Sequence, residues 1–295
     1  MSRLPDFAVI GAARCGTTSL YAHLREHPQI FMSPEKETDY FSLGDLPPDE
    51  VPAAASPYRA RNRAEYEALF RGAGGARAVG EASPTYLFYP RSAARMRELV
   101  PDARVICILR DPIERAYSHF GLARKMGFEV IPDFEAALAA EDERWLRDRS
   151  MRFTYARASF YSGGLREFWV RFPRERILVI LFHEFAADPA GTMRKLYGFL
   201  GVDDRFEPDV GVRHNRSLVP RTSVVREAFS RPRRFRRLLQ RNLPPRLVTR
   251  IGDLIMRPPP GLAPSIRERL LPRFDDDVRR LEALLERDLS AWRSA

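Results

Sequence analysis

Residues 7–20 read Phe-Ala-Val-Ile-Gly-Ala-Ala-Arg-Cys-Gly-Thr-Thr-Ser-Leu, an apolar run followed by a glycine-containing loop and a helical pattern. The run that ends at Gly11 is typical of a buried strand in a parallel sheet. The helical pattern continues to Leu24 and is stopped by His27-Pro28, because the residue before a proline avoids helical geometry. A buried strand that leads through a tight loop into a helix predicts the first unit of an α/β fold.

The alternation of strand and helix patterns continues along the chain. Further strands are predicted at 78–81, 104–110 and 176–182, and helices at 92–99, 111–124, 134–143, 161–172, 188–200 and within 266–292. Residues 44–60 are rich in Pro, Ala and Ser and are predicted to form a loop or insertion. This order predicts a central parallel sheet flanked by helices. No domain boundary stands out, so we interpret residues 1–295 as one domain with 222–295 as its helical extension.

The composition favours a packed domain with anionic partners. Of the 295 residues, 44% are hydrophobic and 30% are charged, and the net charge is +10. A basic chain favours nucleotides, sulfated or phosphorylated substrates or anionic lipid, and no recognised nucleic-acid-binding motif is present. No apolar run approaches the roughly 20 residues of a transmembrane helix. Cys15 and Cys107 are too few for a disulfide framework, and no secretory leader is recognisable, so a cytoplasmic location is expected.

The loop between the first strand and the first helix has the composition of an anion site. A helix N-terminus offers free backbone N–H groups and the positive end of the helix dipole. Gly11 and Gly16 allow a tight turn around an oxyanion, and Arg14 adds a cation. Hydroxyl donors follow at Thr17, Thr18 and Ser19. An ordinary glycine turn is the alternative, but this combination favours a phosphate or sulfate cradle.

The spacing of this loop is close to that of a Walker A motif but departs from it. Thr17 stands where the lysine of G-x-x-x-x-G-K-S/T belongs, and Arg14 lies inside the loop instead. Kinases and ATPases need that lysine and a magnesium ion to handle the charge of a γ-phosphate. No convincing Walker B pattern is present, since the strand at 104–110 ends in Arg110 and Pro112 follows closely. A P-loop nucleotide kinase is therefore the less favoured alternative, and a group with less charge, such as sulfuryl, could be handled without metal.

A second candidate anion site follows the strand at 104–110. The sequence there reads Arg110-Asp-Pro-Ile-Glu-Arg-Ala-Tyr-Ser118-His119. Arg110 is at the carboxyl end of the strand, the edge at which open α/β sheets bind ligands. Ser118 follows two helical turns later, so both side chains could hold one further phosphate. Taken alone, this motif is explained better by a surface arginine and a helix serine.

The two motifs together resemble those of sulfotransferases. The loop at 11–19 resembles their 5′-phosphosulfate loop, and 110–118 resembles their R-D-P-x-x-R-x-x-S motif for the 3′-phosphate. Segments 81–86, 172–176 and 188–190 resemble the heparan sulfate and bacterial branch, so that the resemblance covers residues 6–221. It implies a P-loop-like three-layer α/β fold, 3′-phosphoadenosine 5′-phosphosulfate (PAPS) as donor, and no metal.

The resemblance also implies roles for individual residues. The 5′-phosphosulfate would be held by Arg14, Cys15, Gly16, Thr17, Thr18 and Ser19, and the 3′-phosphate by Arg110 and Ser118. Tyr161 resembles a donor-site tyrosine, and Arg216 or Arg221 would contact the nucleotide from a late loop.

The segment from Glu37 to Phe41 matches the E-x-x-F/Y-F pattern in which the family places its catalytic glutamate. We therefore assign Glu37 as general base, Lys36 as a ligand of the donor sulfate or of the acceptor, and Arg14 as the cation on the bridging oxygen. His119 is the alternative base. Ala82 replaces a lysine of the heparan branch, which Arg14 or Lys36 would compensate.

The expected function is transfer of a sulfuryl group to a hydroxyl, or less readily an amine. The acceptor would be a carbohydrate, a hydroxylated small molecule or a lipid-linked molecule. A non-catalytic basic module that binds nucleotide or membrane is the alternative outside enzymes. Residues 224–256 are basic with interleaved apolar positions, which suits a solvated helix face, an acceptor contact or peripheral membrane contact.

Overall fold

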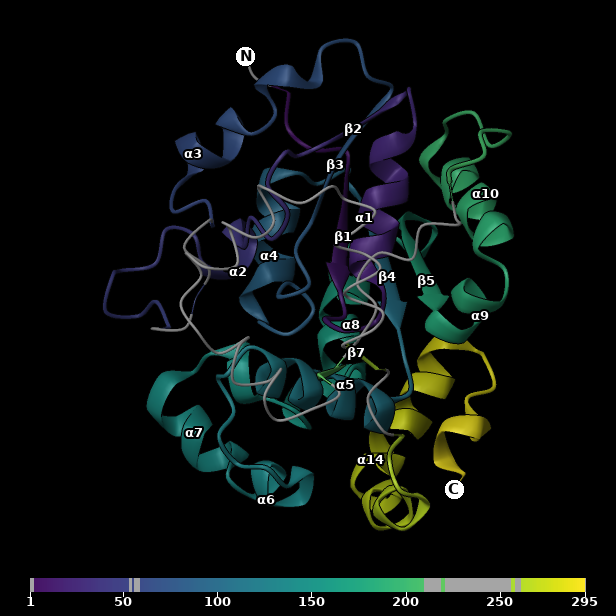
Figure 1. Cartoon of the computed structure of the whole chain (residues 1–295). Helices are drawn as coiled ribbons and strands as arrows, with labels where there is room; N and C mark the ends of the chain where they lie inside the picture. The colour runs from purple at the N-terminus through teal and green to yellow at the C-terminus, as the bar shows by residue number, and fades with distance from the viewer. Residues whose placement is uncertain are drawn as a thin grey trace.

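The computed structural model describes residues 3–52, 55, 59–209, 219–220, 256–257 and 261–294. A parallel sheet in the order β2-β3-β1-β4-β5 lies at its centre (Figure 1). Its strands are β1 (Phe7–Gly11), β2 (Ile30–Met32), β3 (Ala78–Ala82), β4 (Arg104–Leu109) and β5 (Ile177–Leu181). Because β1 and β4 are neighbours, the loops that follow their carboxyl ends meet at one edge of the sheet.

Helices cover both faces of the sheet. Helix α1 (Thr17–Glu26) lies between β1 and β2 in the chain, so this connection runs toward the β2 edge of the sheet. Helix α4 (Arg91–Leu99) connects β3 to β4, and α8 (Ser162–Arg171) lies between β4 and β5, so these connections run toward the β5 edge. Right-handed crossovers therefore place α1 on one face and α4 with α8 on the other (Figure 1). Helix α10 (Pro189–Leu200) joins α1, since Tyr197 donates a hydrogen bond to the His23 carbonyl at 3.1 Å. This arrangement confirms the three-layer α/β fold.

The remaining elements lie around these layers. They are α2 (Tyr40–Leu43), α3 (Arg63–Ala68), α5 (Pro112–Lys125), α6 (Phe134–Ala139), α7 (Glu141–Asp148), α9 (Phe182–Ala187), α14 (Pro264–Leu285) and the antiparallel pair β6 (Val219–Pro220) and β7 (Met256–Arg257). Short 3-10 turns occur at 71–73, 151–153, 157–159, 174–176 and 290–293. Within the described ranges, no helix is both long and apolar enough to span a membrane.

Local sequence signals explain several helix boundaries. The Asp111 carboxylate accepts hydrogen bonds from two backbone N–H groups in the first turn of α5, and Pro112 occupies the first helical position. The Asp188 carboxylate accepts one such hydrogen bond, from the Gly191 N–H at 2.9 Å, at the start of α10, and Gly201 ends the helix with a left-handed conformation, φ 74°. These boundaries confirm the helices predicted after Asp111 and Asp188.

Several of the described elements differ from the sequence predictions, and α2 and α3 were not predicted. Strand β2 was not predicted, because it has only three residues and directly follows the His27–Pro28 stop. The helix predicted at 134–143 is two helices, α6 and α7, which meet at Ala140. The strand predicted at 176–182 ends at Leu181, and α9 begins there without an intervening loop. Arg216, Arg221 and nearly all of 224–256 lie outside the described residues.

Candidate functional site

The loop between β1 and α1 turns through two left-handed residues. Arg14 has φ 72° and Gly16 has φ 102°, and Gly16 directly precedes the first residue of α1. The N-cap residue Gly16 has no side chain to cap this helix, in contrast to Asp111 of α5 and Asp188 of α10. Such a turn at a helix N-terminus directs backbone N–H groups and the positive end of the dipole toward the loop. The predicted anion cradle therefore has the required backbone shape.

Gly16 is required by its surroundings as well as by its backbone conformation. A Cβ atom at this position would lie 3.1 and 3.2 Å from two ring carbons of Phe182. The loop is also tied to the neighbouring strand, since the Ala12 N–H donates to the Ile108 carbonyl at 2.7 Å. The position of the loop is thus set by β4 and by the start of α9.

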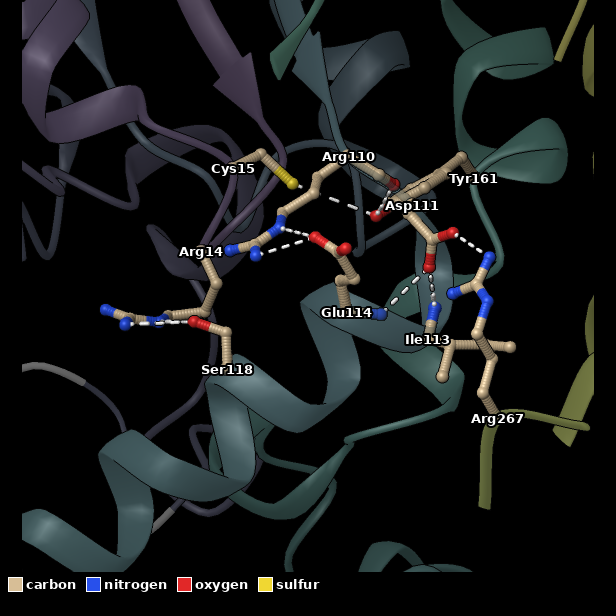
Figure 2. Close-up of polar contacts among 9 residues, drawn as sticks. All are labelled: Arg14, Cys15, Arg110, Asp111, Ile113, Glu114, Ser118, Tyr161 and Arg267. Atoms are coloured by element: carbon tan, nitrogen blue, oxygen red, sulfur yellow. Dashed lines mark hydrogen bonds and ion pairs between the residues drawn. The ribbon is translucent and has the colours of Figure 1, made fainter. Parts of the chain in front are cut away.

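The loop and the second motif meet directly. Arg14 donates from Nε and Nη2 to Ser118 Oγ at 3.2 and 3.1 Å (Figure 2). Arg110 pairs with Glu114 at 2.8 Å and stacks over the Phe182 ring, 5.0 Å from its centre. The two predicted anion motifs, which are about a hundred residues apart in sequence, are therefore in direct contact in the structure.

The site concentrates positive charge. Burial lowers the pKa of Arg14, and the neighbouring charges of Arg110 and Arg115 lower it further. Cations held this close repel one another in a partly desolvated environment, so an anion bound among them would relieve that repulsion. The electrostatics therefore favour a ligand with more than one negative charge.

Arg115 is a member of this cluster to which the sequence analysis gave no role. Its guanidinium is fully buried and donates to neutral acceptors: Ser159 Oγ at 2.6 Å, the Tyr155 carbonyl at 2.5 Å and the Ala13 carbonyl at 3.4 Å. Burial lowers its pKa. The signal in the sequence was its place as the second arginine of the R-D-P-x-x-R pattern, but its burial depends on the 150–160 segment.

Tyr161 connects the loop to the end of β4. Its hydroxyl donates to the Arg110 carbonyl at 2.9 Å and lies 3.7 Å from Cys15 Sγ (Figure 2). Burial raises the pKa of both the tyrosine and the thiol, so both groups are neutral near pH 7. Tyr161 thereby fixes the backbone of Arg110 instead of presenting a charge.

Glu37 and Lys36 lie at the same edge of the sheet. The Glu37 N–H donates to the carbonyl of Ala82, the last residue of β3, at 2.9 Å. Lys36 Nζ pairs with Glu37 Oε1 at 2.5 Å, and the Glu37 side chain is half exposed. The Glu37 carboxylate is thus half exposed, pairs with Lys36 and lies beside β3, which neighbours β1. This position is suited to contact with a ligand that enters from solvent.

Two buried carboxyl groups support this segment, and neither was predicted from the sequence to have a role. Asp39 accepts from Thr85 Oγ1 at 2.7 Å, and burial raises its pKa to about 7. Glu81 is fully buried and burial raises its pKa too. It accepts hydrogen bonds from the hydroxyls of Thr38 at 2.6 Å, Tyr66 at 2.5 Å, Ser83 at 2.8 Å and Tyr86 at 2.8 Å. The residue that follows Glu37 is thereby held to β3.

His119, the alternative base, is buried on α5. Its ring packs edge-on against Tyr155 at 5.2 Å between centres. Burial lowers its pKa well below the ordinary value, and the charges of Arg115 and Arg14 act in the same direction. A histidine in this setting is a weak base, which leaves Glu37 as the better candidate.

Comparison with known proteins agrees with this geometry. Residues 5–208 match the model of the Sulfotransferase family. The crystal structure of a sulfotransferase from Alicyclobacillus acidocaldarius is similar over 99% of both chains, with a TM-score of 0.77 and 34% sequence identity.

Curated relatives match over part of their length. Membrane-associated sulfotransferase kil1 of Dictyostelium discoideum is 34% identical over 117 residues, which cover 40% of this chain and 22% of that protein. Bifunctional heparan sulfate N-deacetylase/N-sulfotransferase 2 of Homo sapiens is 26% identical over 224 residues, 71% of this chain and 24% of that protein. The chain thus spans about a quarter of the length of these relatives. Since the family model covers the sheet and both anion motifs, the chain belongs to the sulfotransferase family.

Proposed function

We propose that this protein transfers a sulfuryl group from PAPS to a hydroxyl of an acceptor. The observation that carries the proposal is the contact between Arg14 and Ser118, which joins two anion motifs at the carboxyl ends of adjacent strands. PAPS carries a phosphosulfate on the 5′ position of its ribose and a phosphate on the 3′ position, so its binding needs two anion motifs side by side. We propose that the cations and backbone amides handle the charge of the donor without a metal.

The proposed roles follow the two motifs. The loop residues Arg14, Cys15, Gly16, Thr17, Thr18 and Ser19 hold the phosphosulfate, and Arg110 and Ser118 hold the 3′-phosphate. Tyr161 contributes by fixing the Arg110 carbonyl. The buried charge of Arg115 adds to the positive potential beneath the loop without contacting solvent. Arg216 or Arg221 completes the nucleotide site from the late loop.

The chemistry is an in-line displacement at sulfur. The acceptor oxygen attacks while Glu37 takes its proton, the new S–O bond forms, and the S–O bond to the donor phosphate breaks. Adenosine 3′,5′-bisphosphate leaves with the electron pair of that bond. Arg14 and the loop amides stabilise the charge that develops on the bridging oxygen, and Lys36 holds the sulfate or the acceptor.

A carbohydrate hydroxyl is the proposed acceptor, with hydroxylated small molecules and lipid-linked molecules as the wider class. The names of two relatives support a carbohydrate: heparan sulfate N-deacetylase/N-sulfotransferase 2 and carbohydrate sulfotransferase 15 of Homo sapiens. Ala82 departs from the lysine of the heparan branch, which makes an amine acceptor of the heparan type the less favoured choice. We propose a cytoplasmic location, with residues 224–256 as the segment for any peripheral membrane contact.

The test is an acceptor screen with radiolabelled PAPS, using glycans, phenols and lipid-linked sugars. We expect transfer of label to at least one hydroxylated class, and Glu37→Gln should lower kcat at least a hundredfold while nucleotide binding is retained. Glu35→Gln removes an exposed carboxylate two residues earlier and is the matched control. Near-normal turnover by Glu37→Gln would refute the base assignment. Nucleotide binding without transfer to any acceptor would favour a binding module, and Mg²⁺-dependent transfer from ATP would favour a kinase.

A further inference from the structure

Helix α14 contacts α5 and α8 (Figure 1), the two helices beside the cation cluster of Arg14, Arg110 and Arg115. It lies outside the residues that match the family model. Each of these two contacts includes one charged side chain of α14 that bonds to the start of the neighbouring helix. The two side chains are Arg267 and Asp277.

Arg267 bonds the residue that directly follows Arg110 in the chain. Its Nη2 donates to Asp111 Oδ2 at 2.7 Å, and the two side chains are only 17% and 11% exposed (Figure 2). The other oxygen of Asp111 caps the first turn of α5. The Arg267 guanidinium is also bonded on its other side, since its Nε donates to the Ser294 carbonyl at 2.8 Å. This network fixes the backbone on the carboxyl side of Arg110.

Asp277 bonds the start of α8. Its buried carboxylate accepts from the Tyr161 N–H at 2.8 Å and from the Ser162 hydroxyl. The Tyr161 hydroxyl then donates to the Arg110 carbonyl at 2.9 Å. Trp292, which follows α14, packs edge-on against the Tyr161 ring at 6.5 Å between centres. This second network therefore ends on the same arginine.

We propose that Arg267 and Asp277 are positioning residues of the donor site, and that α14 holds Arg110 in the orientation that binds the 3′-phosphate. A guanidinium binds phosphate through directed N–H groups in a planar fork, so a small rotation of its backbone costs affinity. The inference rests on the proposed function, and in particular on Arg110 as the ligand of that phosphate.

Charge adds a second reason. Asp111 directly follows Arg110, and its carboxylate would repel a phosphate bound by that arginine. Arg267 neutralises this carboxylate from the side of α14, where both groups are largely shielded from water and the interaction is screened little by salt. Removal of Arg267 therefore affects the phosphate site both through geometry and through repulsion.

The test compares two nucleotides that differ only in the 3′-phosphate. Binding of adenosine 3′,5′-bisphosphate and adenosine 5′-monophosphate to the full chain is measured by calorimetry. We expect Arg267→Ala and Asp277→Asn each to weaken bisphosphate binding about tenfold, which corresponds to one lost charged hydrogen bond. Binding of the monophosphate should change less than about twofold, because it makes no contact with Arg110.

Arg269→Ala is the matched control, since Arg269 lies two residues further along α14 and pairs with Glu135 at the surface. It should leave both affinities unchanged. An equal loss for both nucleotides, or no loss for either, would overturn the inference. If Asp277→Asn does not fold, Arg267→Ala decides alone, with Arg267→Lys expected to recover part of the affinity. A wild-type chain that binds both nucleotides equally would instead reject the proposed function.

Discussion

Arg14 donates two hydrogen bonds to Ser118 Oγ, at 3.2 and 3.1 Å, and so joins the loop after β1 to the helix after β4. The contact orients the Arg14 guanidinium within the cluster that it forms with Arg110 and Arg115. A serine is suited to this task because its hydroxyl accepts from Arg14 and can still donate to a bound anion. We therefore expect the two motifs to act on a ligand as one unit.

Arg14 and Ser118 should be energetically coupled in binding. We expect Arg14→Gln and Ser118→Ala each to weaken binding of adenosine 3′,5′-bisphosphate, and the double variant to lose less than the sum by about 1 kcal/mol. Calorimetry on the four proteins gives the coupling energy. Ser265→Ala on the exposed surface of α14 is the control and should combine additively with Arg14→Gln. Additive losses in the Arg14–Ser118 pair would show that the two residues act independently.

Arg115 should support both folding and ligand binding, and two substitutions separate these contributions. Arg115→Met removes the guanidinium that donates to the Tyr155 carbonyl and to the Ser159 hydroxyl, and the Ser159 hydroxyl is then the remaining donor to that carbonyl, at 3.2 Å. We expect a loss of about 1–3 kcal/mol in stability. It should also weaken bisphosphate binding, since the buried charge is lost. Arg115→Lys keeps the charge but not the planar set of donors, so it should lower stability while it preserves most of the affinity.

Denaturant unfolding and calorimetry on the same samples measure the two effects of the Arg115 variants. Equal affinity loss in Arg115→Met and Arg115→Lys would mean that geometry, and not charge, is the contribution of Arg115 to binding.

Gly16→Ala should disrupt the loop. The left-handed backbone conformation costs an alanine about 1–2 kcal/mol, and its Cβ would also crowd the Phe182 ring at 3.1 Å. We expect a lower unfolding midpoint and a large loss of nucleotide affinity. Gly198→Ala is the matched control, because it lies in α10 with open space around it and should stabilise the protein by about 0.5–1 kcal/mol. An unchanged midpoint for Gly16→Ala would mean that the loop adopts a different backbone conformation.

The sequence predicted the elements whose signals are local. The apolar run before Gly11, the Asp111–Pro112 helix start and the Gly201 stop each depend on neighbouring residues, and the structure confirms all three. The family resemblance also pointed to the two anion motifs. Short elements such as β2 were missed, because three residues are too few to show a period.

The contacts between distant segments were not predictable in the same way. The bond between Arg14 and Ser118 requires β1 and β4 to be neighbours, which pattern alone does not state. Arg115 and Glu81 read as ordinary charged residues, and only the packed structure shows that both are fully buried. Asp277 reaches Tyr161 across more than a hundred residues of chain, which no local signal encodes.

Asp39 should make the stability of the protein depend on pH. Its pKa is raised from 3.8 to about 7 because burial disfavours the charged form, so the folded state prefers the protonated carboxyl. The stability it contributes is fully present below about pH 4 and is lost as the pH rises toward 7. Asn is neutral throughout and can accept the same hydrogen bond from Thr85. Asp39→Asn should therefore differ little from wild type near pH 4 and be more stable near pH 8, by about 4 kcal/mol at most.

Urea unfolding of Asp39→Asn and wild type at both pH values measures this difference, with Glu35→Gln as the control for loss of an exposed carboxylate from the same segment. The control should not change the pH dependence that Asp39 imposes. A stability difference between Asp39→Asn and wild type that is the same at both pH values would show that Asp39 does not titrate in this range. If Asp39 titrates as expected, its carboxyl, two residues from Glu37, is uncharged at low pH and charged at high pH. The rate of sulfuryl transfer should therefore be measured over the same interval.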